Sequence, residues 1–181
     1  MKYARSVLFV IFMFWVLPAH AFSVKNLTLL DQSMQIWVHE AIRQSLALSH
    51  TDYEAQISKN AHLFTKKGYN GYRSAIMTSD TFLDAAIDFK SDLIALPYVY
   101  VKNEQAFVIR EKDEIEDGLH EWKVMVHVAL HYDVPFGTSR TKRRTIDYPV
   151  ILQVRQIEAE APYDFKISRW YIRDDYNAMF D

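Results

Sequence analysis

The sequence predicts an α+β fold in which N-terminal helices pack on a curved antiparallel sheet. Apolar residues recur every three or four positions in the first half of the chain and every second position in the second half. All expected helices precede the expected strands. This order is typical of helices gathered on one face of an antiparallel sheet.

The first helix is expected over residues 30–48, and either Thr28 or Asp31 can cap its start. Three shorter helices are expected after it: one begins after Asp52, one spans residues 69–77 and one begins after Ser79. The apolar positions of the first helix lie at intervals of three and four and form one stripe: Leu30, Met34, Trp37, Ala41, Ser45 and Leu48. We expect this stripe to lie in the core.

Strands are expected after Pro97. Two short β-rich runs, at residues 98–101 and 106–109, flank a turn-like segment. Two long strands, at residues 122–131 and 146–154, alternate apolar and polar side chains, and a last strand follows at residues 166–173. Because these strands follow one another along the chain, they predict a meander. Pro149 favours an edge position or a bulge for the strand at residues 146–154. Trp122 is the first apolar residue on the apolar face of the strand at residues 122–131.

The N-terminus predicts export from the cytoplasm. Lys2 and Arg5 precede an apolar run over residues 6–17, and Ala19-His20-Ala21 provides a small-x-small cleavage site. We therefore expect a signal peptide over residues 1–21 and one exported domain over residues 22–181. The alternative is an uncleaved membrane anchor, although the run is shorter than the roughly 20 residues that span a bilayer.

Composition excludes several classes of function. Lys2 and Arg5 leave with the signal, so the 21 basic residues fall by two against 23 acidic residues, and the formal charge of the exported chain is about −4. This balance argues against nucleic acid as a partner. The chain contains no cysteine, which excludes thiol catalysis, cysteine-based zinc sites and iron–sulfur clusters.

No motif in the sequence assembles a catalytic set. The phosphate-binding, dinucleotide-binding and nucleophile-elbow patterns are all missing. His127 and His131 share a strand face, but four residues separate them by about 13 Å, too far to hold one metal ion. We therefore expect a protein that is not an enzyme and that has no cofactor or metal.

A basic cluster is the candidate interaction site. It falls in the expected connection between the two long strands, on a chain that is otherwise acidic: Arg140, Lys142, Arg143 and Arg144. Such a cluster can contact a lipid headgroup, an acidic partner or nucleic acid, and the acidic balance of the chain argues against nucleic acid. The alternative is a solvated hairpin tip that keeps the end of the sheet from aggregating.

The order of several short segments resembles the DotI/IcmL/TraM family. The helix around Trp37 is followed by Phe64-Thr65-Lys66-Lys67-Gly68-Tyr69, then by Tyr72-Arg73-Ser74-Ala75-Ile76 and Ser79. The strand Glu121-Trp122-Lys123-Val124-Met125-Val126, which runs on to Tyr132, is similar to the family's strand with its W-K-V core. Together these segments cover about residues 30–173.

The resemblance implies a periplasmic component of a type IVB secretion or conjugation machine. Such a component is a non-enzymatic scaffold that binds other secretion subunits and itself. The resemblance also implies a domain beside the inner membrane whose fold is similar to the nuclear-transport-factor-two-like (cystatin-like) fold. The typical member has a cytoplasmic segment and a membrane span before this domain, whereas here five residues precede the apolar run. That departure favours a soluble periplasmic relative. The alternative function is a small-ligand binder or enzyme that uses a pocket between helices and sheet.

Overall fold

The computed structural model describes residues 27–97, 100–101, 104–136 and 138–171, so the expected signal peptide lies outside the described residues. The helices and helical turns are α1 (Leu29–Leu46), α2 (Tyr53–Lys59), η1 (Asn60–Leu63), α3 (Lys66–Thr78), α4 (Asp80–Leu83), the π-helical turn η2 (Asp84–Asp88) and η3 (Glu116–Gly118). The strands are β1 (Ile94–Pro97), β2 (Tyr100–Val101), β3 (Glu104–Gln105), β4 (Phe107–Glu114), β5 (His120–Phe136), β6 (Arg140–Gln156) and β7 (Phe165–Trp170).

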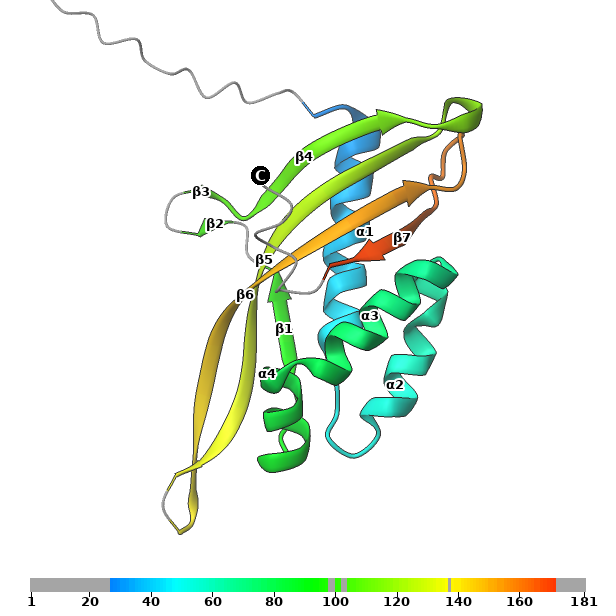
Figure 1. Ribbon diagram of the computed structural model, residues 1–181. Coiled ribbons are helices and arrows are strands. Elements are labelled where there is room, and N and C mark those ends of the chain that lie inside the picture. Colours follow the sequence, from blue (N-terminus) through cyan, green and yellow to red (C-terminus); the bar gives the residue numbers. More distant parts are fainter. Residues whose placement is uncertain (1–26, 98–99, 102–103, 137, 172–181) are drawn as a thin grey trace, which may run out of the picture.

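The five-stranded sheet is antiparallel and is organised around the long pair β5 and β6 (Figure 1). β4, β5, β6 and β7 are neighbours in chain order, as the expected meander requires, and β1 joins them by pairing with β5. β1 and β4 share one edge of β5, because β4 pairs with the half up to Val126 and β1 with residues 128–131. β2 and β3 form a separate two-stranded sheet.

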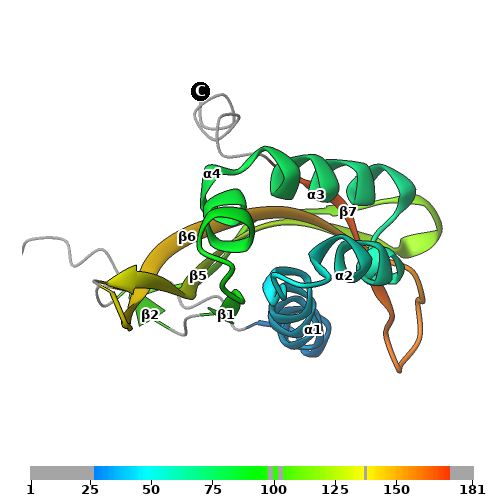
Figure 2. The same cartoon turned by 90° about the horizontal axis from the view of Figure 1, so that it is seen from below.

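α1 lies within the curve of β5 and β6, while α3 runs beside β7 (Figure 2). The core includes the inward face of the sheet and the buried face of α1, so the predicted α+β fold is confirmed. The expected stripe of α1 is correct only in part, because the buried face also includes Val38, Ile42 and Leu46. Trp122 is completely buried, whereas Trp37 is only partly buried and packs against the ring of Phe165. Within the described ranges, none of the helices is both long and apolar enough to cross a membrane.

A buried polar contact fastens the start of α1 to the sheet. Thr28 caps α1, and the side chain of Asp31 accepts a hydrogen bond from the backbone N–H of Thr28. The other carboxylate oxygen of Asp31 accepts hydrogen bonds from Lys112 Nζ at 2.8 Å and from Trp122 Nε1 at 2.9 Å. Asp31 therefore joins the first turn of α1 to β4 and β5.

The pKa of Asp31 follows from these contacts. Burial by itself would raise it, but the hydrogen bonds from Lys112, Thr28 and Trp122 outweigh burial and lower the pKa to about 2. The carboxylate is therefore charged in the folded protein at every pH at which the chain is expected to work.

The backbones of α3 and β7 are in direct contact. The side chain of Thr65 caps α3 by accepting the N–H of Gly68, and the backbone N–H of Thr65 donates to the carbonyl of Ile167 at 3.0 Å. A Cβ at Gly68 would overlap that same carbonyl, and one at Gly71 would lie 2.9 Å from the carbonyl of Trp170. Both glycines are thus required by close packing.

Several expected boundaries are wrong. The segment after Leu93 forms β1 in place of a helix end, and β4 continues through the acidic residues 111–114 that follow its apolar start. α3 begins at Lys66, three residues earlier than its apolar stripe indicated. The edge position expected for Pro149 is confirmed, because β7 pairs with β6 only from Leu152 onward.

Replacing Asp31 with Asn is expected to lower the free energy of unfolding by about 2 kcal/mol at pH 7, since the folded-state pKa lies nearly two units below the ordinary value. A lowered folded-state pKa means that the contribution is complete above about pH 4 and is lost as the pH falls towards 2. Urea unfolding of both proteins between pH 7 and pH 2 checks this. Glu116→Gln, on the exposed turn η3, is the control and should change little; a difference that persists unchanged at pH 2 contradicts the assignment.

Replacing Gly68 with Ala is expected to destabilise the protein by about 1–3 kcal/mol, because the new methyl group must push α3 away from β7. In an exposed helix the same change stabilises by about 1 kcal/mol, so the sign of the effect is diagnostic. Ser74→Ala, at an exposed position of the same helix, is the matched control. Denaturant unfolding measures all three proteins, and a more stable Gly68→Ala variant would show that the two elements are not in close contact.

Candidate functional site

β5 and β6 extend beyond the rest of the sheet as a two-stranded ribbon (Figure 1). β1 pairs with β5 only as far as His131, and β7 pairs with β6 only over residues 152–156. We call residues 132–136 of β5 and 140–146 of β6 the arm. The arm is held by its own strand pairing and by the contacts at its base.

The expected position of the basic cluster is corrected by the structure. Arg140, Lys142, Arg143 and Arg144 belong to β6 and are not part of a loop, because β5 continues through Pro135 to Phe136. The backbone N–H of Asp133 points away from β6, towards Ser91. Pro135 is two residues further along β5, so its backbone nitrogen also points away from β6. The absence of an N–H on Pro135 therefore breaks no hydrogen bond between β5 and β6.

Strand alternation divides the four cations between two faces of the arm. Arg140, Lys142 and Arg144 lie opposite Phe136, Val134 and Tyr132, and all six point to one face, which we call the basic face. Arg143 points to the other face, where its Nε lies 3.2 Å from Oδ1 of Asp133. Among the described residues, no ion pair involves Arg140 or Lys142. The two are therefore available to a partner.

An aromatic stack anchors the arm to the helical layer. The ring of Tyr132 is buried and stacks on Phe89 with ring centroids 6.2 Å apart. The guanidinium of Arg144 lies over the same ring at 5.9 Å, within the range of a cation–π contact. Arg144 is thus partly engaged in structure. Beyond it, Phe136 is 61% exposed, so the end of the basic face carries a free aromatic side chain.

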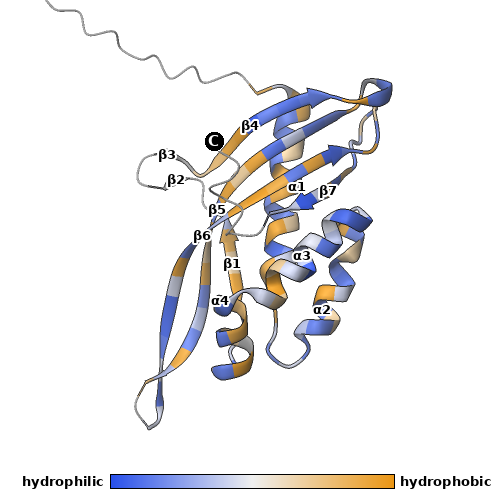
Figure 3. Ribbon diagram, in the orientation of Figure 1, coloured by the Kyte–Doolittle hydropathy of each residue, from blue (hydrophilic) through white to orange (hydrophobic). Residues whose placement is uncertain are grey.

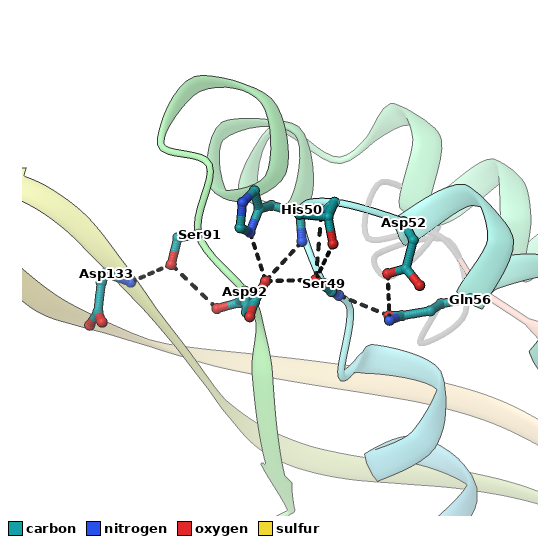
Figure 4. A network of polar contacts seen from close by, with 8 residues as sticks. Ser49, His50, Asp52, Gln56, Ser91, Asp92 and Asp133 are labelled. Atoms are coloured by element: carbon teal, nitrogen blue, oxygen red, sulfur yellow. Dashed lines mark hydrogen bonds and ion pairs between the residues drawn. The ribbon is translucent and has the colours of Figure 1, made fainter.

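A cleft of about 420 Å³ lies at the base of the arm. It is lined by His50, Phe89, Lys90, Ser91, Asp92, Ile94, His131, Tyr132, Asp133, Pro135, Thr141 and Arg143. Figure 4 shows the polar network on one side of it, in which Asp92 accepts hydrogen bonds from Ser49 Oγ and from the backbone and ring of His50. Hydrogen bonding by the His50 ring, followed by that from its backbone, lowers the pKa of Asp92.

The network is arranged for structure more than for catalysis. Asp92 lies between Ser49 and His50, so the imidazole is not placed to take a proton from the hydroxyl as a general base would. Ser91 accepts the N–H of Asp133 and so joins the segment before β1 to the arm. His131 bonds Thr145 across the ribbon at 2.8 Å. Among the described residues, no cluster of His, Asp or Glu could hold a metal ion.

The alternative function requires a pocket between helices and sheet. The cleft at the base of the arm has walls from both, since His50 and Phe89 border the helices and Tyr132 belongs to β5. A second gap, of about 10 Å³, lies within the helical layer and is lined by Leu48, Tyr53, Ile76, Met77, Phe82, Leu83 and Leu93. Large rings fill the neighbouring interior: Phe64 stacks on Tyr72 at 4.6 Å, and Trp170 meets Tyr72 edge-on. Burial raises the pKa of Tyr72, and its hydroxyl donates to the backbone carbonyl of Ser45 at 2.7 Å.

The sequence profile of a protein family described as a type IVB secretion system inner-membrane complex component, DotI/IcmL, matches residues 18–173. The chain belongs to this family. No curated protein matches significantly.

Three solved structures share the fold. A periplasmic fragment of TraM has a TM-score of 0.58 at 18% identity over 77% of this chain and 93% of its own. The periplasmic domain of DotI gives 0.58 at 16% identity, over 78% and 93%. An IcmL-like type IV secretion system protein from Legionella pneumophila gives 0.50 at 15%, over 77% and 89%. The family resemblance inferred from the sequence is therefore confirmed.

The structure adds residues to the site that the sequence reading missed. Phe136 falls in the expected connection between the two long strands, yet the structure places it in β5, at the end of the basic face of the arm. The sequence does contain a sign of this longer strand, because Val134 and Phe136 continue the two-residue apolar period of β5. Pro135 lies between them and indicates the end of the strand. The bond between His50 and Asp92, 42 positions apart, had no sequence signal.

Replacing Arg140 and Lys142 with Ser is expected to shift the melting temperature by less than about 2 °C, because both side chains are exposed and unpaired, and surface changes of this kind are usually nearly neutral. Tyr132→Ala should lower it by about 10 °C, since it removes a buried ring that stacks on Phe89. Thermal unfolding followed by circular dichroism checks both variants. A large loss for the first variant would mean that these cations are packed inside the fold.

Proposed function

We propose that the protein is a non-enzymatic periplasmic subunit or accessory of a type IVB secretion apparatus, where it acts as an assembly module that binds other subunits. The family match, which covers most of the chain, carries this proposal. The packing of aromatic rings in the core supports it, since Phe64, Tyr72 and Trp170 are in contact there. The gap within the helical layer is far smaller than the roughly 300–1,000 Å³ that small-ligand sites usually occupy. The chain's distinctive polar residues lie outside, on the arm and around its base.

Residues 1–21 are proposed as a cleaved signal peptide that leaves residues 22–181 as one periplasmic domain. An uncleaved inner-membrane anchor is the alternative, and it would hold the same domain on the periplasmic side. Two of the similar solved structures are described as periplasmic, which supports this location for the domain.

A small-ligand binder is the second candidate, and the cleft beside His50 is the observation that favours it. Its volume suits a small molecule, and it has cationic and anionic groups on its walls. Against this, the polar side chains of the cleft already form contacts between separate segments of the chain, as Ser91, Asp92 and Asp133 do. The assembly module therefore remains the better supported function.

The test is affinity purification of the tagged full-length chain from the detergent-solubilised envelope of cells that express the apparatus. We expect defined subunits of the secretion system to co-purify, and we expect the released chain to begin at Phe22. The Arg140→Ser/Lys142→Ser variant, once circular dichroism shows that it is folded, reports whether the arm contributes. Recovery of the chain without any subunit of the apparatus, or with a stoichiometric small molecule, would overturn the assembly proposal.

A further inference from the structure

Charge is separated along the β5–β6 ribbon. The arm is basic at one end. At the other end the β4–β5 and β6–β7 connections meet, because Glu114 lies opposite His120 and Glu121 lies opposite Arg155. Exposed carboxylates gather there, and we call them the acidic end: Asp113, Glu114, Glu116, Asp117, Glu158 and Glu160. Figure 3 shows hydrophilic residues over this end and along β6 of the arm.

Like charges are left facing one another at the acidic end. Asp113 lies directly opposite Glu121 on neighbouring strands, an arrangement that destabilises a sheet. The carboxylate of Glu121 accepts hydrogen bonds from Gln153, Arg155 and Ser168. In the described part of the chain no ion pair reaches Asp113. A basic partner at this end would remove the repulsion.

The arm shows the converse arrangement. Arg140, Lys142 and Arg144 occupy alternate positions of one strand, so their side chains leave the same face about 6–7 Å apart. The single acidic side chain of the described arm, Asp133, points to the opposite face and is paired with Arg143. The basic face therefore has no carboxylate of its own, and it ends in the exposed ring of Phe136.

One molecule cannot satisfy both ends by itself. β5 alone has 17 residues, so the two ends lie roughly 50 Å apart along the ribbon. We propose that the basic face of the arm docks on the acidic end of a second copy of this chain, head to tail. Ile115 and Leu119, half-buried apolar residues on either side of η3, offer a surface for Phe136. The pair then keeps one free arm, on one copy, and one free acidic end, on the other, which is the geometry of a heterologous contact.

The inference goes beyond the proposed function, because it concerns the purified chain and requires no other subunit. If no secretion subunit co-purifies, the proposed self-association is unaffected. If the chain does not self-associate, the proposed role in the secretion apparatus is unaffected.

Charge reversal at each end tests the contact. The purified chain is studied by sedimentation velocity at low and high salt, since screening shortens from about 30 Å at 0.01 M to about 10 Å at 0.1 M. Wild type should associate at low salt and dissociate at high salt. Arg140→Glu/Lys142→Glu alone and Asp113→Lys/Glu116→Lys alone should each weaken association more than about tenfold, because attraction becomes repulsion.

Complementary mixing is the decisive measurement. An equimolar mixture of the two reversed variants should recover the association, and so should a chain carrying all four changes. Lys66→Glu/Lys67→Glu, which makes the same charge change at exposed positions of α3, is the matched control and should associate like wild type. Circular dichroism confirms that every variant is folded.

If the arm binds something other than a second copy of the chain, the experiments give different results. If the arm binds phosphatidylglycerol vesicles in flotation and the mixture does not recover association, the surface is a membrane contact and the proposal is overturned. Wild type that stays monomeric at low salt, or reversed variants that associate like wild type, also overturn it.

Discussion

The unequal lengths of the strands constrain this molecule more than any other feature. β5 and β6 pair over 16 successive positions, whereas their neighbours cover only parts of them. Where neighbours are present, the inward face is covered by α1 and closes a core around Trp122. Where they are absent, the same two strands become a ribbon with solvent on most sides. One pair of strands thus provides both the core and the exposed arm.

Polar contacts hold the helices to the sheet both near the core and at the base of the arm. Asp31 fixes the beginning of α1 to β4 and β5 at the far end of the sheet, and Ser91 fixes the segment before β1 to the arm. Between them, α3 is pressed against β7 through Gly68 and Gly71. The helical layer therefore holds the sheet at separate points along its length, and the orientation of the arm relative to the core follows from these fixed points.

Periodicity was sufficient to predict the fold, because the stripe of α1 and the alternation of β5 and β6 reflect burial directly. It failed where one residue masked the period, as Pro135 did, and where a strand is polar, as in the second half of β4. The basic cluster was found from composition, but its division into a basic face and Arg143 on the other side depends on register. Contacts such as His50 with Asp92 depend on tertiary structure, which local patterns do not encode.

Pro149 has a consequence for how the protein avoids uncontrolled assembly. The N–H of His127, its cross-strand partner, points away from β6, so the ring nitrogen of Pro149 faces the free edge of that strand. An incoming strand would find a donor missing there, in the middle of an otherwise open edge. Pro149 therefore weakens this edge as a template for a growing sheet, which favours recognition through side chains, whose charges can be selective.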